Sequence, residues 1–174
     1  MTVQGITIPV ASGSSLAAID TGTSLIGGPS AVVKAIYKAI PGSHTFQNME
    51  GFYSFRTSLR SNFNFSGVLM TLAACMTTVS ITLAFGGKPW PINPVDLSIA
   101  QLPNGDCVGA IFDLSGGSVI PAGTPSWVVG DAFLKNVYSV FRESPPSVGF
   151  AALSALAKAG GSGPWCVVSS PWWF

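Results

Sequence analysis

The stretch Ala17-Ala18-Ile19-Asp20-Thr21-Gly22-Thr23-Ser24-Leu25-Ile26 decides how this sequence is interpreted. Its apolar first residues predict a buried strand that ends in one carboxylate, and Thr-Gly-Thr-Ser then turns the chain before apolar residues resume. Buried carboxylates are rare unless they are paired or hydrogen-bonded, so an Asp at the end of such a strand needs an explanation. Asp, Thr and Gly are also ordinary turn residues, so this stretch alone fits a turn as well as a functional loop.

The composition indicates one domain with little polar surface. The chain has 174 residues, of which 48% are hydrophobic and only 9% are charged, against a charged share of about 25% in an average globular protein. This predicts a piece of something larger, with an apolar face meant for a partner. The net charge is +1, and the basic residues are scattered, so we expect no nucleic-acid partner and no anionic membrane surface.

The cysteines and the histidine do not form a metal-binding pattern. Cys75, Cys107 and Cys166 allow one disulfide and leave one cysteine over. None of them forms a CxxC pair, and the only histidine, His44, lies in a polar turn at the expected surface, so we expect no metal and no cofactor. Residues 1–5 have neither the basic start nor the apolar core of a signal peptide. We therefore expect an internal piece of a longer protein, or a gene model that begins too late.

Short apolar runs between 20 glycines and 13 prolines predict a mostly β fold. A hairpin is expected from residues 5–10 and 16–20. Gly28-Pro29-Ser30 opens a helix that residues 31–40 continue with apolar side chains at helical spacing. Residues 126–135 predict a strand, a Gly-Asp turn and a short helix. Further strands are expected at 51–55, 79–85, 88–92, 107–112, 137–141 and 147–151.

No charged residue occurs between Arg60 and Lys88, so a membrane-spanning helix has to be weighed. Ser and Thr interrupt this run repeatedly, and residues 79–85 alternate between apolar and small or polar side chains. That alternation is typical of a half-buried strand. We therefore expect strands here and no membrane span.

Two distant stretches carry a family resemblance together. They are Ala18-Ile19-Asp20-Thr21-Gly22-Thr23-Ser24 and Trp127-Val128-Val129-Gly130-Asp131-Ala132-Phe133. With the ending Val148-Gly149-Phe150-Ala151, their order and separation resemble the C-terminal lobe of pepsin-like aspartic proteases, most of all the fungal secreted members. The resemblance implies a mostly β lobe of a bilobal fold, built of antiparallel sheets with one or two short helices. This lobe covers residues 1–152, and 153–174 form an irregular tail.

The resemblance also implies a role for each residue of the loop. Asp20 is one half of a catalytic pair of carboxylates, and the Thr21 hydroxyl locks the two loops of the pair together. Gly22 lets the backbone approach and donate to the carboxylate, while the hydroxyls of Thr23 and Ser24 bond Asp20 or the substrate. The remaining implied residues are the supporting strand Val128, Val129 and Gly130 and the disulfide pair Cys75 and Cys107.

The activity implied is aspartic-type endopeptidase, with peptides or proteins as substrates. Two carboxylates held close together cannot both ionise, so they share a proton and activate one water. This chain has a single Asp-Thr-Gly, so we expect it to be inactive alone and to need the N-terminal lobe of the same protein. The family resemblance places the protein outside the cell or in the vacuole.

Three alternatives stay open at this point. A symmetric homodimer could bring two copies of the loop together. A decayed lobe could keep the fold and act as an inactive binding or structural module. The loop also resembles the phosphoenzyme loop of cation-pumping ATPases, but the Lys that follows Asp there is absent and no Mg-binding acidic motif follows.

Residues 56–74 interrupt the resemblance. Without these residues, Gly51-Phe52-Tyr53-Ser54-Phe55 would run directly into Cys75-Met76-Thr77, as in the family. We hypothesise that the stretch is an insertion, a retained intron translated in frame. Sequencing of transcripts should then recover mostly messages that lack it, and a majority of messages that span it intact would refute the hypothesis.

Overall fold

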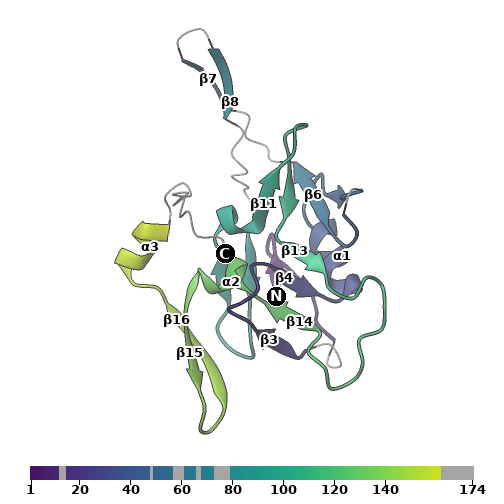
Figure 1. Cartoon of the computed structure of the whole chain (residues 1–174), viewed down its shortest axis with the longest axis vertical. Coiled ribbons are helices and arrows are strands. Elements are labelled where there is room, and N and C mark those ends of the chain that lie inside the picture. Colours follow the sequence, from purple (N-terminus) through teal and green to yellow (C-terminus); the bar gives the residue numbers. More distant parts are fainter. Residues whose placement is uncertain (12–14, 48, 57–60, 66–67, 73–78, 162–174) are drawn as a thin grey trace, which may run out of the picture.

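The computed structural model describes residues 1–11, 15–47, 49–56, 61–65, 68–72 and 79–161 (Figure 1). Cys75 and Cys166, and the tryptophans after residue 161, lie outside this part. The described chain is mostly β, as the sequence predicts. Three four-stranded sheets form the body, and two hairpins extend from it.

A mixed sheet lies at the centre of the fold. Its order is β13 (Ile111–Asp113), β4 (Ile26–Gly28), β14 (Trp127–Val129) and β3 (Ala17–Ile19). β14 runs parallel to β3 and antiparallel to β4, while β13 runs parallel to β4. The resemblance implies antiparallel sheets, and this sheet contains two parallel strand pairs beside its antiparallel one.

The prediction of a hairpin from residues 5–10 and 16–20 is wrong. β2 (Ile6–Thr7) pairs with β1 (Thr2–Val3), whereas β3 pairs with β14, far along the sequence. Local alternation cannot distinguish a strand that pairs with its neighbour from one that pairs with a distant segment. The distant pairing places the end of β3 beside the end of β14.

The other two sheets are antiparallel. The first has the order β10 (Trp90–Ile92), β9 (Ile81–Leu83), β1, β2. The strands predicted at 79–85 and 88–92 are confirmed as β9 and β10, which pair with each other. The second has the order β11 (Ser98–Gln101), β12 (Asp106–Gly109), β6 (Tyr53–Arg56), β5 (His44–Thr45). The single strand expected at 107–112 is two strands, β12 and β13, in different sheets.

Helix α1 (Ser30–Lys38) confirms the predicted helix and covers β13. It begins after Pro29 and buries Val33, Ile36 and Tyr37. The Tyr37 hydroxyl donates to the backbone oxygen of Ile111 over 2.6 Å. A Cβ on Gly109 would lie 1.9 Å from that hydroxyl oxygen, so only glycine leaves room for this buried contact.

Two short helical segments lie near the mixed sheet. Helix α2 (Asp131–Leu134) follows β14 directly, as predicted. The 3-10 helix η2 (Pro94–Leu97) contacts it. The strands predicted at 137–141 and 147–151 are confirmed as β15 (Val137–Arg142) and β16 (Ser147–Ala152), which pair as a hairpin.

The structure contains a helix where an irregular tail was expected. α3 (Ala155–Gly161) follows β16, so the described chain has a third α-helix beyond the two, α1 and α2, that lie within residues 1–152. None of the helices in the described ranges has the length and apolarity needed to cross a bilayer.

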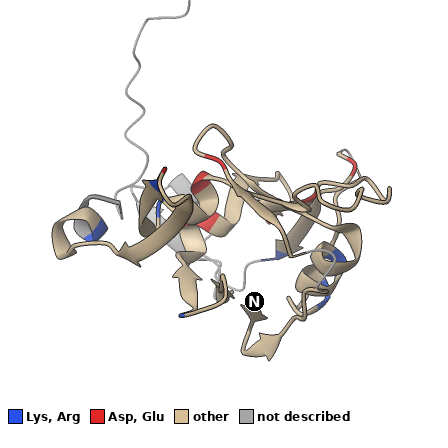
Figure 2. Cartoon of the chain, turned by 90° about the horizontal axis from the view of Figure 1, so that it is seen from below, with Lys and Arg blue, Asp and Glu red and all other residues tan. Residues whose placement is uncertain are grey.

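In Figure 2 the basic residues of α1 and α3 lie on opposite sides of the view, with acidic residues spread between them.

One apolar core joins the sheets to α1 and α2. Its fully buried side chains come from all of these elements. The largest of them are Phe55, Phe133, Ile26, Ile36 and Ile111. Burial of a side chain of this size stabilises the fold by about 1.5–3 kcal/mol.

The stretch 56–74 contains a separate hairpin. β7 (Ser61–Phe65) pairs with β8 (Val68–Leu72) in a two-stranded sheet. Figure 1 shows this hairpin projecting from the body. Whether the stretch is an insertion stays a hypothesis.

Candidate active site

Asp20 follows β3 directly and is held in place by its own loop. Its backbone N–H donates to the Val129 oxygen over 3.1 Å. The carboxylate accepts two hydrogen bonds, one per oxygen. The Gly22 N–H donates to Oδ1 at 2.8 Å, and the Thr23 hydroxyl donates to Oδ2 at 2.5 Å. The carboxylate is thus fixed by short-range donors while remaining open to solvent.

The loop that carries Asp20 is fixed from the other side by the end of β14 and the start of α2. Three consecutive backbone N–H groups donate to three consecutive carbonyl oxygens of the loop. Gly130 donates to Leu25 at 3.0 Å, Asp131 to Thr23 at 2.8 Å and Ala132 to Ser24 at 2.9 Å. The N–H groups that a helix start leaves unpaired are used here to hold the loop.

Gly130 is required for this close approach. A Cβ at this position would lie 2.0 Å from the Thr23 backbone oxygen and 2.7 Å from that of Leu25. Backbone atoms cannot move aside as a flexible side chain can. Any other residue at position 130 would therefore push the Asp20 loop away from β14.

The same hydrogen bonds set the charge of Asp20. Donation from the Thr23 hydroxyl, followed by donation from the Gly22 N–H, lowers the pKa of Asp20 below its ordinary value of 3.8, and the small opposing effect of desolvation does not cancel this. Hydrogen bonds to a carboxylate favour its charged form. In this chain Asp20 therefore stays ionised into the acid range.

The family model for eukaryotic aspartyl proteases matches residues 1–153. The chain belongs to the eukaryotic aspartyl protease family. It is 32% identical to the major aspartyl peptidase 1 of Cryptococcus neoformans var. grubii, over 94% of this chain and 31% of that protein. It is 29% identical to cathepsin D of Bos taurus, over 87% of this chain and 34% of the relative.

These relatives confirm the pepsin-like resemblance and leave its finer detail open. They include fungal and animal proteins, among them human cathepsin D at 31% identity over 86% of this chain and 33% of that protein. A fungal origin therefore stays a prediction. The chain spans about a third of the length of the curated relatives it matches.

The other residues expected in the site of this aspartyl protease chain differ in their exposure. Thr21, Gly22 and Ser24 are exposed, and Val129 and Gly130 are buried. Val128 pairs with Ala18 of β3 and with Gly27 of β4. Together these residues surround Asp20 on the edge where β3 and β14 end.

Cys107 and His44 lie in the β11–β12–β6–β5 sheet. Cys107 is fully buried on β12, whereas Cys75 is outside the described residues, so their pairing stays a prediction. The His44 side chain is 55% exposed, as expected. It also contacts the buried Ser54 hydroxyl, with 2.9 Å between Nε2 and Oγ, and lies 3.6 Å from the buried Asp106.

A second hydrogen-bonded carboxylate, Asp113, escaped the sequence analysis. It accepts hydrogen bonds from the hydroxyls of Ser30 and Ser115 and from the backbone N–H groups of Ser115 and Gly116. Burial raises the pKa of Asp113, but these hydrogen bonds outweigh it and leave the pKa below its ordinary value. The network ties the loop after β13 to the start of α1.

Asp113 is not placed to pair with Asp20. β13 and β3 are opposite edge strands of the mixed sheet, three strand spacings of about 4.8 Å apart. They also run in opposite directions, so Asp113 at the end of β13 and Asp20 after β3 lie at opposite ends of the sheet. Asp113 therefore fixes a loop and does not complete a catalytic pair.

The Thr23 hydroxyl should control the pKa of Asp20. Replacing Thr23 with Val removes the stronger of the two donors, so we expect the Asp20 pKa to rise towards 3.8 in the variant. The pKa of Asp20 is lower in the folded chain than in the unfolded chain. The stability that these donors contribute is therefore present above the unfolded-state pKa and is lost as the pH falls through the folded-state pKa. Thr23→Val should reduce this contribution. A carboxyl ¹³C NMR titration of the chain measures the shift directly.

Thr21→Val is the matched control, because it leaves both donors to Asp20 in place. An Asp20 pKa that is unchanged in Thr23→Val, or that rises equally in both variants, would contradict the assignment.

Proposed function

We propose that this chain supplies one of the two carboxylates of an aspartic-type endopeptidase, and that Asp20 is that carboxylate. The observation that carries the proposal is the Asp20 loop itself. A solvent-facing carboxylate is held by Gly22 and Thr23 and anchored to β14, in a chain that matches the aspartyl protease family over residues 1–153.

The proposed chemistry needs a second carboxylate close to Asp20. The pair shares one proton, because two adjacent carboxylates cannot both ionise. The ionised carboxylate takes a proton from a water, whose oxygen attacks the peptide carbonyl carbon, while the protonated carboxyl donates to the carbonyl oxygen. The tetrahedral intermediate then collapses as the amide nitrogen is protonated and the C–N bond breaks. No covalent enzyme intermediate is formed.

The hydrogen bonds on Asp20 suit it to the ionised role. Both of its oxygens accept a donor from its own loop, so the charged form is stabilised before any partner approaches. The protonated form is then expected on the other carboxylate. Since interacting carboxylates titrate as a unit, the pair has macroscopic pKa values that belong to neither residue alone.

We propose that the second carboxylate comes from the N-terminal lobe of the same protein. The sequence holds one Asp-Thr-Gly. The relatives that it matches are about three times as long. Asp113 is excluded as the partner by its place in the mixed sheet. A homodimer that pairs two copies of the Asp20 loop is the competing arrangement.

An exposed hairpin supports the proposal of a partner lobe. β15 and β16 pair only with each other among the described strands, and an isolated two-stranded hairpin is marginally stable in water. Its exposed apolar side chains include Tyr138, at 63% exposure, and Phe141, at 54%. We propose that the N-terminal lobe covers this hairpin.

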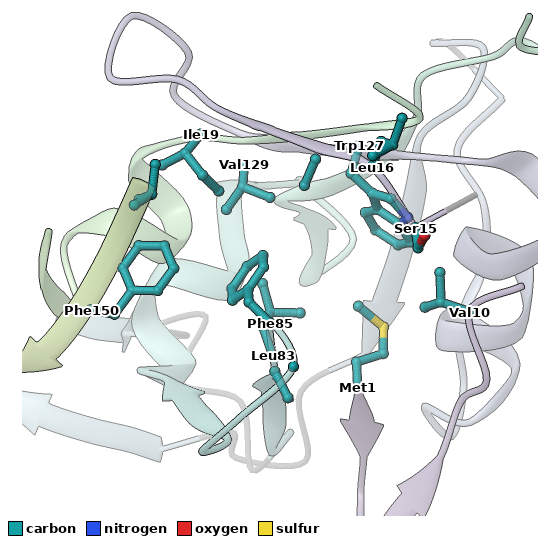
Figure 3. A pocket seen from close by; sticks show the side chains of 14 residues that line it. Met1, Val10, Ser15, Leu16, Ile19, Leu83, Phe85, Trp127, Val129 and Phe150 are labelled. Carbon is teal, nitrogen blue, oxygen red and sulfur yellow. The ribbon is translucent and has the colours of Figure 1, made fainter. Parts of the chain in front are cut away.

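A neighbouring pocket extends this apolar surface. It has a volume of about 430 Å³ and is lined mainly by apolar side chains from several elements. Figure 3 shows Phe85 and Phe150 on one side of it and Met1 and Val10 on the other. Val148 and Phe150 of β16 belong to its lining, and Val148 pairs with Phe141, so the pocket continues the face of the hairpin that carries Phe141. Contact with the partner lobe would remove this surface from water.

Three finer roles follow from the family resemblance and belong to the same proposal. The exposed Thr21 hydroxyl locks the two loops together, and Ser24 contacts the substrate backbone. Cys75 and Cys107 form a disulfide, which peptide mapping without reduction would test.

The protein acts outside the cell or in an acidic vacuolar or lysosomal compartment, which a reporter fusion to the full-length protein would test.

Asp20→Asn should abolish proteolysis by the full-length protein that contains both lobes. We expect cleavage of an unfolded protein at acid pH, inhibition by a statine-type transition-state mimic, and a loss of kcat of about 10³-fold in the variant, the size typical of a missing general acid or base. The chain of 174 residues alone should not cleave.

Asp113→Asn is the control, since it neutralises another hydrogen-bonded carboxylate, which accepts four donors where Asp20 accepts two and lies at the other end of the sheet. It should keep its activity once the folded fraction is accounted for. Activity that survives Asp20→Asn would remove Asp20 from the mechanism. A full-length protein that folds but cleaves nothing would favour the inactive binding module.

A further inference from the structure

Helix α2 is too short to hold its own position. It has four residues, and a single turn does not form stably without tertiary contacts, because nucleation costs more than its few hydrogen bonds return. Nevertheless the N–H groups at its start hold the three carbonyl oxygens of the Asp20 loop. Whatever fixes α2 therefore also fixes the loop.

The side chain of Asn136, just beyond α2, makes three hydrogen bonds to three segments. Its Oδ1 accepts from the Asn93 N–H after β10 at 2.8 Å. Its Nδ2 donates to Asp96 Oδ2 of η2 at 3.1 Å and to the Ala132 oxygen of α2 at 3.1 Å. Both amide protons and the amide oxygen are thereby used.

A neighbouring ion pair reinforces the same junction. Lys135 Nζ lies 2.5 Å from Asp96 Oδ1, so the Asp96 carboxylate receives Lys135 on one oxygen and Asn136 on the other. The Asp96 side chain is only 11% exposed. Charge-assisted contacts at a partly buried carboxylate are stronger than those between neutral groups. The end of α2 is thus tied to η2 by two adjacent side chains.

We propose that Asn136 is a positioning residue for the Asp20 loop, and that it acts through α2. The connection runs through a single residue of the helix. Asn136 holds the Ala132 oxygen, and the Ala132 N–H holds the Ser24 oxygen. Ser24 directly follows Thr23, whose hydroxyl donates to Asp20.

The consequence for Asp20 has a definite direction. If α2 loosens, its N–H groups release the carbonyls of residues 23–25, and the Thr23 hydroxyl loses its fixed distance to Asp20. The donors that keep Asp20 ionised then weaken. The charged side chains at the two ends of α2 are Asp131 at its start and Lys135 with Asp96 beyond its end. Asn136 itself is neutral, so its replacement changes none of these charges.

Asn104 provides a matched control for the replacement of Asn136. Its side chain makes two hydrogen bonds, one fewer than that of Asn136: it donates to Asp106 Oδ2 at 2.8 Å and accepts from the Asp106 N–H at 3.1 Å. It lies in the turn between β11 and β12, in a different sheet from the Asp20 loop. Asn104→Ala and Asn136→Ala thus delete the same side chain in two places.

The first test needs no catalytic activity. In the chain of 174 residues, Asn136→Ala should speed amide hydrogen exchange at residues 130–132 and 22–25 several-fold relative to Asn104→Ala, after correction for any difference in global stability. If Asn136→Ala does not fold, Asp96→Ala removes the shared partner of Asn136 and Lys135 and should also speed exchange at the same amides relative to Asn104→Ala. Equal exchange at these amides in the two Asn variants would overturn the proposal.

The second test is kinetic and rests on the proposed function. In the full-length protein, Asn136→Ala should lower kcat about tenfold with little change in KM, and should move the acid limb of the kcat/KM profile to higher pH. Asn104→Ala should leave the acid limb at the same pH, because a loss of folded protein lowers kcat/KM equally at every pH and does not shift the profile. A limb that does not move in Asn136→Ala would overturn the proposal. If the full-length protein has no activity at all, the proposed function fails while the exchange experiment still decides the role of Asn136.

Discussion

The backbone contact between the start of α2 and the Asp20 loop is the constraint on which the rest of the site depends. Three N–H groups, from residues 130 to 132, meet three carbonyl oxygens, from residues 23 to 25. Nearly all backbone polar groups removed from water need such partners. The contact satisfies both sides at once, and it is possible only because Gly130 has no Cβ to strike the Thr23 oxygen.

The mixed sheet brings the two halves of this contact together. β3 delivers Asp20 and β14 delivers Gly130, and the parallel pairing of these strands makes them end on the same edge. β4 then returns antiparallel to β14 and carries the chain into α1. The Asp20 carboxylate at this edge is fixed through its backbone and by the donors of its own loop. The residue nevertheless remains partly exposed to solvent. That combination of a rigid backbone and an accessible carboxylate suits a catalytic role.

The sequence predicted those elements whose signals are local. The Pro29 start and apolar spacing indicated α1, and the strand, Gly-Asp turn and helix at residues 126–135 indicated β14 and α2. The pairing of β3 was not predictable from alternation, because the same pattern fits a hairpin with residues 5–10 and a parallel strand beside β14. The family resemblance supplied the link between Asp20 and residues 128–130 that local patterns could not. Asn136 gave no signal, since its partners Asn93 and Asp96 lie about 40 residues away. The Asp113 network was missed because its link to α1 runs through Ser30, which is 83 residues away in the sequence.

We infer that Asp20 is one of two carboxylates that act on the same water. A crystal structure of the full-length protein with a statine-type inhibitor tests it most directly, because the inhibitor hydroxyl takes the place of that water. We expect the hydroxyl to lie within hydrogen-bond distance of Asp20 and of a second carboxylate from the N-terminal lobe, with Gly22 and Thr23 still donating to Asp20. A hydroxyl bound away from Asp20, or an Asp20 carboxylate facing no second carboxylate, would contradict it.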